Sequence, residues 1–233
     1  MQLKTGFCTC CGSSQTVNVR SEIENYTSDL AKYFDFKRLN LNTCSNCGFV
    51  AEDITTFFGL GVFPIVQSKE YRELLDNSYM DGYKDLPEQD YQKVSVGQFE
   101  AYVLLCKEEN KLLDLAKALA YISDIKRMLS STYNENKYDY DYDEYQERYD
   151  EISEKLFNEA QKANAECIEV LKQVNIEPNY YFDVFVAERY AIAEKYKHAK
   201  NIIDRVYQNT NFDDEMKNYI NEFLTEVEKL WIS

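Results

Sequence analysis

Two short cysteine motifs near the N-terminus constrain the fold of this chain more than any other feature. Residues 8–12 (CTCCG) and 44–48 (CSNCG) each contain the pattern C-x-x-C followed by glycine. Two residues between cysteines allow a tight turn to present both sulfurs to one ion at ~2.3 Å. The glycine permits a positive φ angle, so that neighbouring backbone amides can point at the sulfurs.

The two motifs together supply four cysteines, which predict a closed tetrahedral zinc site. The predicted ligands are Cys8, Cys11, Cys44 and Cys47. A segment of ~50 residues buries too little surface to fold well alone, and zinc binding supplies ~10–16 kcal/mol in small finger peptides. Because four thiolates leave no open coordination position for water, we expect the Zn²⁺ to be structural and not catalytic.

Three further cysteines fall outside this ligand set. Cys10 lies inside the first motif, and we expect it to point to solvent. Two alternatives to zinc remain for the cluster: free thiols in a loop, or a redox switch that uses Cys10. Cys106 and Cys167 lie on apolar helix faces and are expected to be small buried side chains.

The 32 residues between the two motifs exceed the usual ribbon spacing of ~15–20 residues. Residues 16–19 and 36–41 roughly alternate between apolar and polar, which predicts two strands. Residues 21–33 between them are expected to form a short helix or a loop insertion.

The rest of the chain has a helical pattern. Only 7 Gly and 3 Pro occur in 233 residues, which argues against an all-β fold. From about Ser95 apolar residues recur every three or four positions to the end. The sequence therefore predicts three parts: a zinc ribbon with an insertion (1–53), an apolar bridge with a short helix that Ser68 caps (54–94), and a TPR-like helical domain (95–233) with an acidic tyrosine-rich linker near 132–143.

One stretch of this domain fits the small and aromatic positions of a tetratricopeptide (TPR) unit. The matching residues are Ala187, Tyr190, Tyr196, Ala199, Ile203 and Val206. Small alanines let two antiparallel helices approach closely, and Tyr190 and Tyr196 would fill the seam as candidate groove residues. Any amphipathic hairpin could also produce this pattern. The expected fold class is mainly α, with antiparallel TPR-like hairpins and a small N-terminal β zinc ribbon.

The layout resembles a bacterial family of uncharacterised proteins, domain of unknown function 2225. The matching stretches are residues 8–12, 44–49, 99–129 and 187–208. The resemblance implies a zinc ribbon, with the four motif cysteines as ligands, followed by TPR-like helices. It implies no known activity.

The charge distribution bears on partners and location. The chain carries a net charge of −15, yet residues 1–50 hold five Lys/Arg and four Asp/Glu. An acidic body repels nucleic-acid backbones and anionic lipid. The N-terminus lacks the apolar core of a signal peptide, and the longest apolar stretch, 54–66, is shorter than the ~20 residues that span a bilayer. We therefore expect a cytoplasmic protein that neither enters a membrane nor favours nucleic acid.

Enzymatic activity is not expected. The single histidine, His198, falls at an exposed helix position, and no nucleophile elbow, P-loop or zinc-protease motif occurs. The leading hypothesis is an interaction or adaptor protein, whose helical-repeat groove binds a peptide or helix of a basic protein partner.

Two other functions stay open. The ribbon could bind nucleic acid through Arg20, Lys37 and Arg38, with Tyr33 and Phe36 as a stacking platform. The second alternative is a thiol redox sensor.

Overall fold

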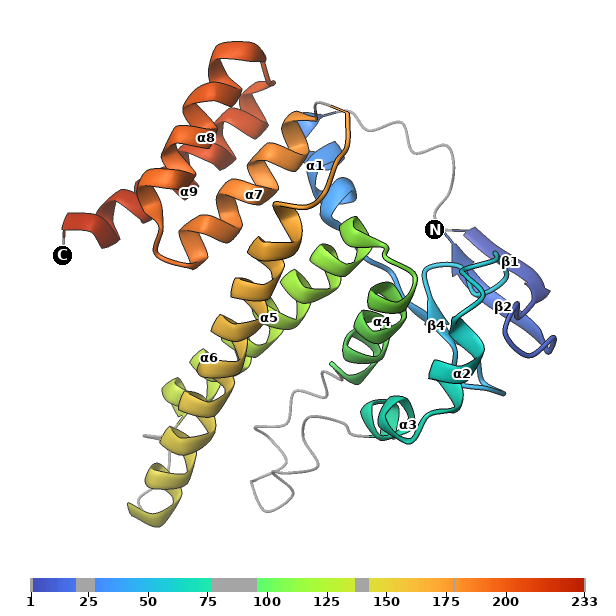
Figure 1. The fold of residues 1–233 in the computed structure, drawn as a ribbon. Helices are drawn as coiled ribbons and strands as arrows, with labels where there is room; N and C mark the ends of the chain where they lie inside the picture. Colours follow the sequence, from blue (N-terminus) through green and yellow to red (C-terminus); the bar gives the residue numbers. More distant parts are fainter. Residues whose placement is uncertain (1, 20–27, 77–95, 137–142, 178, 233) are drawn as a thin grey trace.

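The computed structural model describes residues 2–19, 28–76, 96–136, 143–177 and 179–232. The chain is mainly helical, with a small β-rich part that holds the cysteine motifs (Figure 1), as the sequence predicts. Within the described ranges, no helix combines the length and hydrophobicity needed to cross a lipid bilayer.

The β-rich part consists of two antiparallel strand pairs. Strand β1 (Gln2–Phe7) pairs with β2 (Ser14–Val19), and β3 (Asn42–Thr43) pairs with β4 (Val50–Ala51). The predicted strand at 16–19 is therefore confirmed. Each connection between paired strands carries one C-x-x-C motif, so the two motifs occupy equivalent positions in two similar turns.

The predicted strand at 36–41 is wrong. Helix α1 (Asp29–Lys37) occupies the first part of that range, and the Ser28 hydroxyl caps it by accepting the Ala31 amide at 3.3 Å. The helix packs against α7 (Tyr180–Ile192) and α9 (Asp214–Ile232), which lie far along the chain (Figure 1). Burial of aromatic side chains on that surface outweighs the local alternation that favoured a strand.

Two short helices follow the ribbon. Helix α2 (Val62–Gln67) and helix α3 (Lys69–Asp76) lie next to one another, and α3 also packs against α4 (Gly97–Glu108). The Ser68 hydroxyl accepts the Tyr71 amide at 3.2 Å, so the predicted cap of the 69–76 helix is confirmed.

The two longest helices form an antiparallel hairpin that extends away from the other helices (Figure 1). They are α5 (Leu112–Asn136) and α6 (Asp143–Leu171). The linker expected near 132–143 is partly wrong, because 132–136 belong to α5 and 137–142 lie outside the described residues. The far half of the hairpin has its own apolar cluster, separate from the main core: Leu129, Tyr133, Tyr149, Ile152 and Leu156.

Helices α7 and α8 (Tyr196–Asn209) form the hairpin that the TPR-like pattern predicts. Ala187 and Ala199 are fully buried, and the turn between the helices places Glu194 at a φ of 59°. Small side chains let the two helices approach closely, as expected. Helix α9 packs against α8 and α1 and ends the array (Figure 1).

Candidate metal centre

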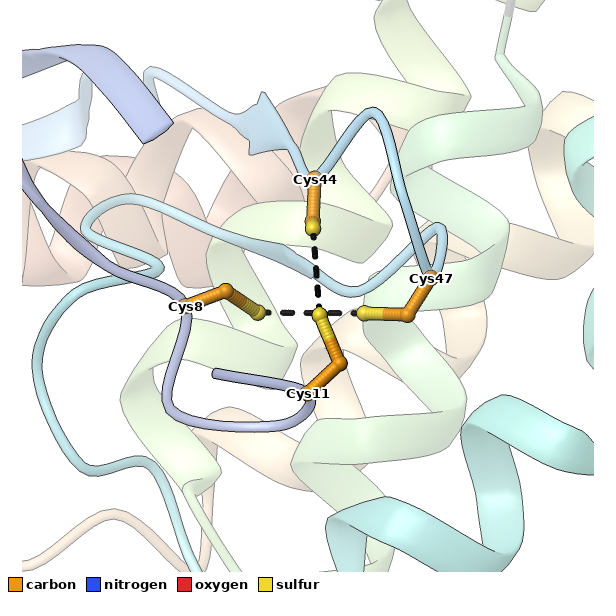
Figure 2. Close-up of side chains that lie close together, drawn as sticks. All are labelled: Cys8, Cys11, Cys44 and Cys47. Atoms are coloured by element: carbon orange, nitrogen blue, oxygen red, sulfur yellow. Dashed lines mark hydrogen bonds between the residues drawn. The ribbon is translucent and has the colours of Figure 1, made fainter. Parts of the chain in front are cut away.

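The four predicted ligand cysteines meet at one point between the two turns (Figure 2). Their sulfurs all lie within 4.8 Å of one another, with 3.7 Å between Cys8 and Cys47 and 3.8 Å between Cys11 and Cys44. Four ligands at ~2.3 Å around a tetrahedral ion lie ~3.8 Å apart, whereas a disulfide bond measures ~2.05 Å. This group of four cysteines could hold one metal ion.

Both motifs adopt the same backbone turn. In each, the amide of the first cysteine donates to the carbonyl five residues later, and the glycine amide donates back to the first cysteine, over 2.8 to 2.9 Å. Gly12 has a φ of 75° and Gly48 a φ of 76°. The predicted need for a positive φ after the second cysteine is thus confirmed at both positions.

Backbone amides point at the first sulfur of each motif. The Cys8 sulfur accepts from the amides of Cys10 and Cys11, and the Cys44 sulfur accepts from the two equivalent amides. Burial nevertheless raises the pKa of the Cys8 thiol to about 11. A cation at the centre would counter this desolvation and keep the sulfurs deprotonated.

Polar side chains supply further donors around Cys11. Burial raises its pKa, but hydrogen bonds from Asn46 and Ser13 outweigh that effect and lower the pKa to about 6. The Ser13 hydroxyl lies 3.1 Å from the Cys11 sulfur and 3.5 Å from the Cys44 sulfur, and so contacts both motifs. Hydrogen bonds of this kind to metal-ligand sulfurs orient the sulfurs and favour the thiolate form.

The arrangement suits a structural ion. Cys8, Cys44 and Cys47 are buried, and four sulfurs complete a tetrahedron without a position for water or substrate. An ion held by these four sulfurs would cross-link the two turns.

The prediction that Cys10 points to solvent is wrong. Its side chain is half-buried, packs against the main core and interacts with the Cys47 sulfur. Burial raises the pKa of the Cys10 thiol, which favours the less reactive protonated form. Cys106 and Cys167 are fully buried, as expected.

The predicted stacking platform for nucleic acid is also wrong. Tyr33 is fully buried, with its ring 5.8 Å from that of Tyr219. Phe36 is half-buried and packs edge-on against Phe185 at 6.4 Å between ring centres. Neither ring is available to stack on a base, because α1 presents both to the helical domain.

The structure describes two of the three basic residues proposed with that platform. Lys37 makes an ion pair with Glu188 at 3.1 Å, and its ammonium group lies over the Tyr33 ring. Arg38 is exposed, and Arg20 lies outside the described residues.

The two predicted groove tyrosines line different cavities. Tyr190 stacks on His198 with 5.5 Å between ring centres, and His198 is exposed, as expected. Tyr196 lines a cavity of about 500 Å³. Sequence reasoning missed the charged residues of this second cavity, although adjacent Glu188 and Arg189 within an apolar helix gave a usable signal.

Comparisons of this chain with protein-family models, with curated proteins and with solved structures found no match. The resemblance to domain of unknown function 2225 therefore stays a prediction.

Proposed function

We propose that this chain is a zinc-dependent adaptor, in which a structural Zn²⁺ holds the ribbon together and the helical domain binds a peptide or helix of a partner protein. The observation that supports it is a cavity of about 500 Å³ among the helices, in a chain whose candidate metal site consists of four cysteines in the ribbon. Ligand sites in proteins have volumes of ~300–1,000 Å³.

Zinc is the ion that this donor set favours for a structural role. Tetrahedral sites of four thiolates hold zinc or iron, and zinc has no redox chemistry of its own. Metal analysis of protein purified without chelator should find one zinc per chain. If the analysis finds one iron per chain instead, the metal would have a role in electron transfer and not a purely structural one.

A basic partner fits the charge of the chain. With a net charge of −15, long-range electrostatics attract cationic surfaces and repel anionic ones. We infer no catalytic role for the metal, since its four sulfur ligands complete the coordination sphere.

Affinity capture from native cells, followed by binding with the purified partner, tests the proposal. The informative variant is Cys44→Ser, which removes a ligand, and its matched control is Cys10→Ser, which changes a half-buried cysteine in the same cluster. Wild type and Cys10→Ser should bind the partner equally, and Cys44→Ser should lose it. Zinc-loaded wild type that binds no protein directly would refute the adaptor role.

A further inference from the structure

The cavity beside Tyr196 lies where helices from distant parts of the chain meet. Residues from α5 to α9 line it, together with Lys37 at the end of α1. Part of its wall is apolar: Phe157, Ile192, Tyr196 and Phe223. An apolar wall with a few converging polar groups is typical of a ligand site.

Two ion pairs satisfy most of the charges in this cavity. Arg189 is buried and binds both oxygens of the Asp124 carboxylate, at 2.8 and 3.2 Å. Glu188 is also buried, pairs with Lys37 at 3.1 Å and accepts the Tyr219 hydroxyl. These four charges are neutralised in place, so none of them is an anchor for a ligand.

Arg127 remains without a carboxylate partner among the described residues. Its guanidinium lies 5.9 Å over the Phe157 ring and donates one hydrogen bond of 3.4 Å to the Ile192 carbonyl. A guanidinium has five N–H donors and binds planar anions with two at once. Arg127 therefore lies in the cavity with donors to spare and a stacked ring that limits its movement.

A second donor in the same wall lacks an acceptor. The Nε–H of Arg189 is buried and has no hydrogen-bond partner in the described part of the chain. Buried polar groups without partners are uncommon in folded proteins. Both of these groups are donors, so this part of the wall is suited to an acceptor, although the exposed Glu194 also lines the cavity.

We propose that this cavity binds a carboxylate carried on an apolar body, with the carboxylate paired to Arg127 and the body against the aromatic wall. A doubly charged phosphate fits less well, because Asp124, Glu188 and Glu194 also line the cavity. The proposal rests on the adaptor function and commits to one occupant: the C-terminal residue of a partner peptide, with an apolar side chain and a free α-carboxylate.

Matched probes test the site on the zinc-loaded full chain. The first is N-acetyl-glycyl-glycyl-phenylalanine, the second its C-terminal amide, and the third 3-phenylpropionate, a free acid of similar shape. Calorimetric or NMR titration should show the acid peptide binding at least ~10-fold tighter than the amide, the factor expected for one charge-assisted hydrogen bond. In Arg127→Gln, the affinity for the acid peptide should fall to that for the amide.

Arg205→Gln is the control, because Arg205 is an exposed arginine on α8 that lines the other cavity. It should leave binding of all three probes unchanged. The proposal is overturned if acid and amide bind equally, or if Arg127→Gln keeps the preference for the acid. Binding of 3-phenylpropionate as tight as that of the acid peptide supports the carboxylate site but overturns the peptide occupant.

Failure of this inference can be told apart from failure of the adaptor function. A partner that binds wild type and Arg127→Gln equally leaves the adaptor role standing and removes the carboxylate site. If the acid probes bind in a way that depends on Arg127 but no protein partner is found, the carboxylate site stands and the adaptor role fails.

Discussion

The two cysteine motifs share one backbone turn but have different surroundings. A Cβ atom added at Gly12 would meet nothing within 4 Å, whereas one at Gly48 would lie 2.9 Å from a methyl group of Leu75. Cys11 is exposed and Cys47 is buried. The same C-x-x-C-G pattern thus folds once with its second cysteine exposed and once with it buried, and we expect the metal to contribute more to the order of the first turn.

The contacts of the two turns support this difference. Residues 49–51, which follow the second motif, are all buried, and the Tyr71 hydroxyl of α3 bonds to the backbone on both sides of Phe49. Outside the cysteines, the first motif and its strands are held by polar contacts. They include the Thr9 amide, which donates to the Ile54 carbonyl at 3.0 Å, and the Lys4–Asp53 ion pair at 2.7 Å.

Removing the metal should have the largest effect on hydrogen-exchange protection. The loss should be greater in the first turn than in the second. In Cys44→Ser, or after chelation, we expect amides of β1, β2 and residues 8–13 to lose protection from hydrogen exchange by ~1,000-fold or more, given the ~10–16 kcal/mol that structural zinc contributes in finger peptides. Residues 49–51 should keep part of their protection, because helices cover them. Exchange measured by mass spectrometry resolves these segments.

Cys10→Ser is the control for that experiment and should keep both turns protected. Equal loss of protection in the two motifs would show that burial does not support the second turn. Full protection in the metal-free protein would show that neither turn depends on the ion.

Alanine in place of each motif glycine compares the turns directly. A positive φ costs a non-glycine residue ~1–2 kcal/mol at either position. Gly48→Ala should cost a further ~0.5–1.5 kcal/mol, because the new methyl group forces the end of the Leu75 side chain to move. Urea unfolding of the zinc-loaded proteins measures the loss of free energy of unfolding in Gly12→Ala and in Gly48→Ala. Equal losses would contradict the tighter packing around Gly48.

Tyr71→Phe removes an anchor of the second turn only. The Tyr71 hydroxyl accepts the Val50 amide and donates to the Gly48 carbonyl, each at 3.0 Å, and the side chain is fully buried. Loss of these bonds leaves buried backbone groups unpaired, at a cost of ~1–3 kcal/mol. The matched control is Tyr180→Phe, which removes an exposed hydroxyl bonded to Asn209 and should change the unfolding midpoint little.

The metal centre could be predicted from sequence because its information is local. Each motif needs only two cysteines, their spacing and a glycine, and these determine a turn whatever surrounds it. Helix α1 could be predicted only in part: the short helix or loop insertion expected at 21–33 covers its first residues, whereas the sequence predicts a strand at its end. Residues 36 and 37 belong to a stretch that alternates as a strand would, and only packing against α7 and α9, which lie more than 140 positions further along the chain, selects the helix.

The cavity was beyond sequence reasoning for the same reason. Lys37 and Glu188 are 151 positions apart, and Asp124 and Arg189 are 65 apart. A single sequence shows that these charges exist but not which of them neutralise each other. Arg127 stands out only after the ion pairs around it are known.

The smallest expected effect concerns an anchor of the first turn. Burial raises the pKa of Asp53, but bonds from Lys4, Thr55 and Thr56 outweigh it and lower the pKa to about 2 from its ordinary 3.8. Because the folded pKa is the lower one, these bonds stabilise the fold fully above pH ~4, and the contribution is lost as the pH falls towards 2. Partial exposure of both partners limits it to about 1 kcal/mol.

Comparing zinc-loaded Asp53→Asn with zinc-loaded wild type isolates this contribution, because both proteins keep the folded first turn in which Lys4 and Asp53 meet. The difference in free energy of unfolding should be constant from pH 5 to 7 and should shrink below pH 4. The mutation should also lower the exchange protection of β1, because the partner of Asp53 in the ion pair is Lys4 of β1. A difference independent of pH would mean that the Asp53 carboxylate does not hold this turn through its charge.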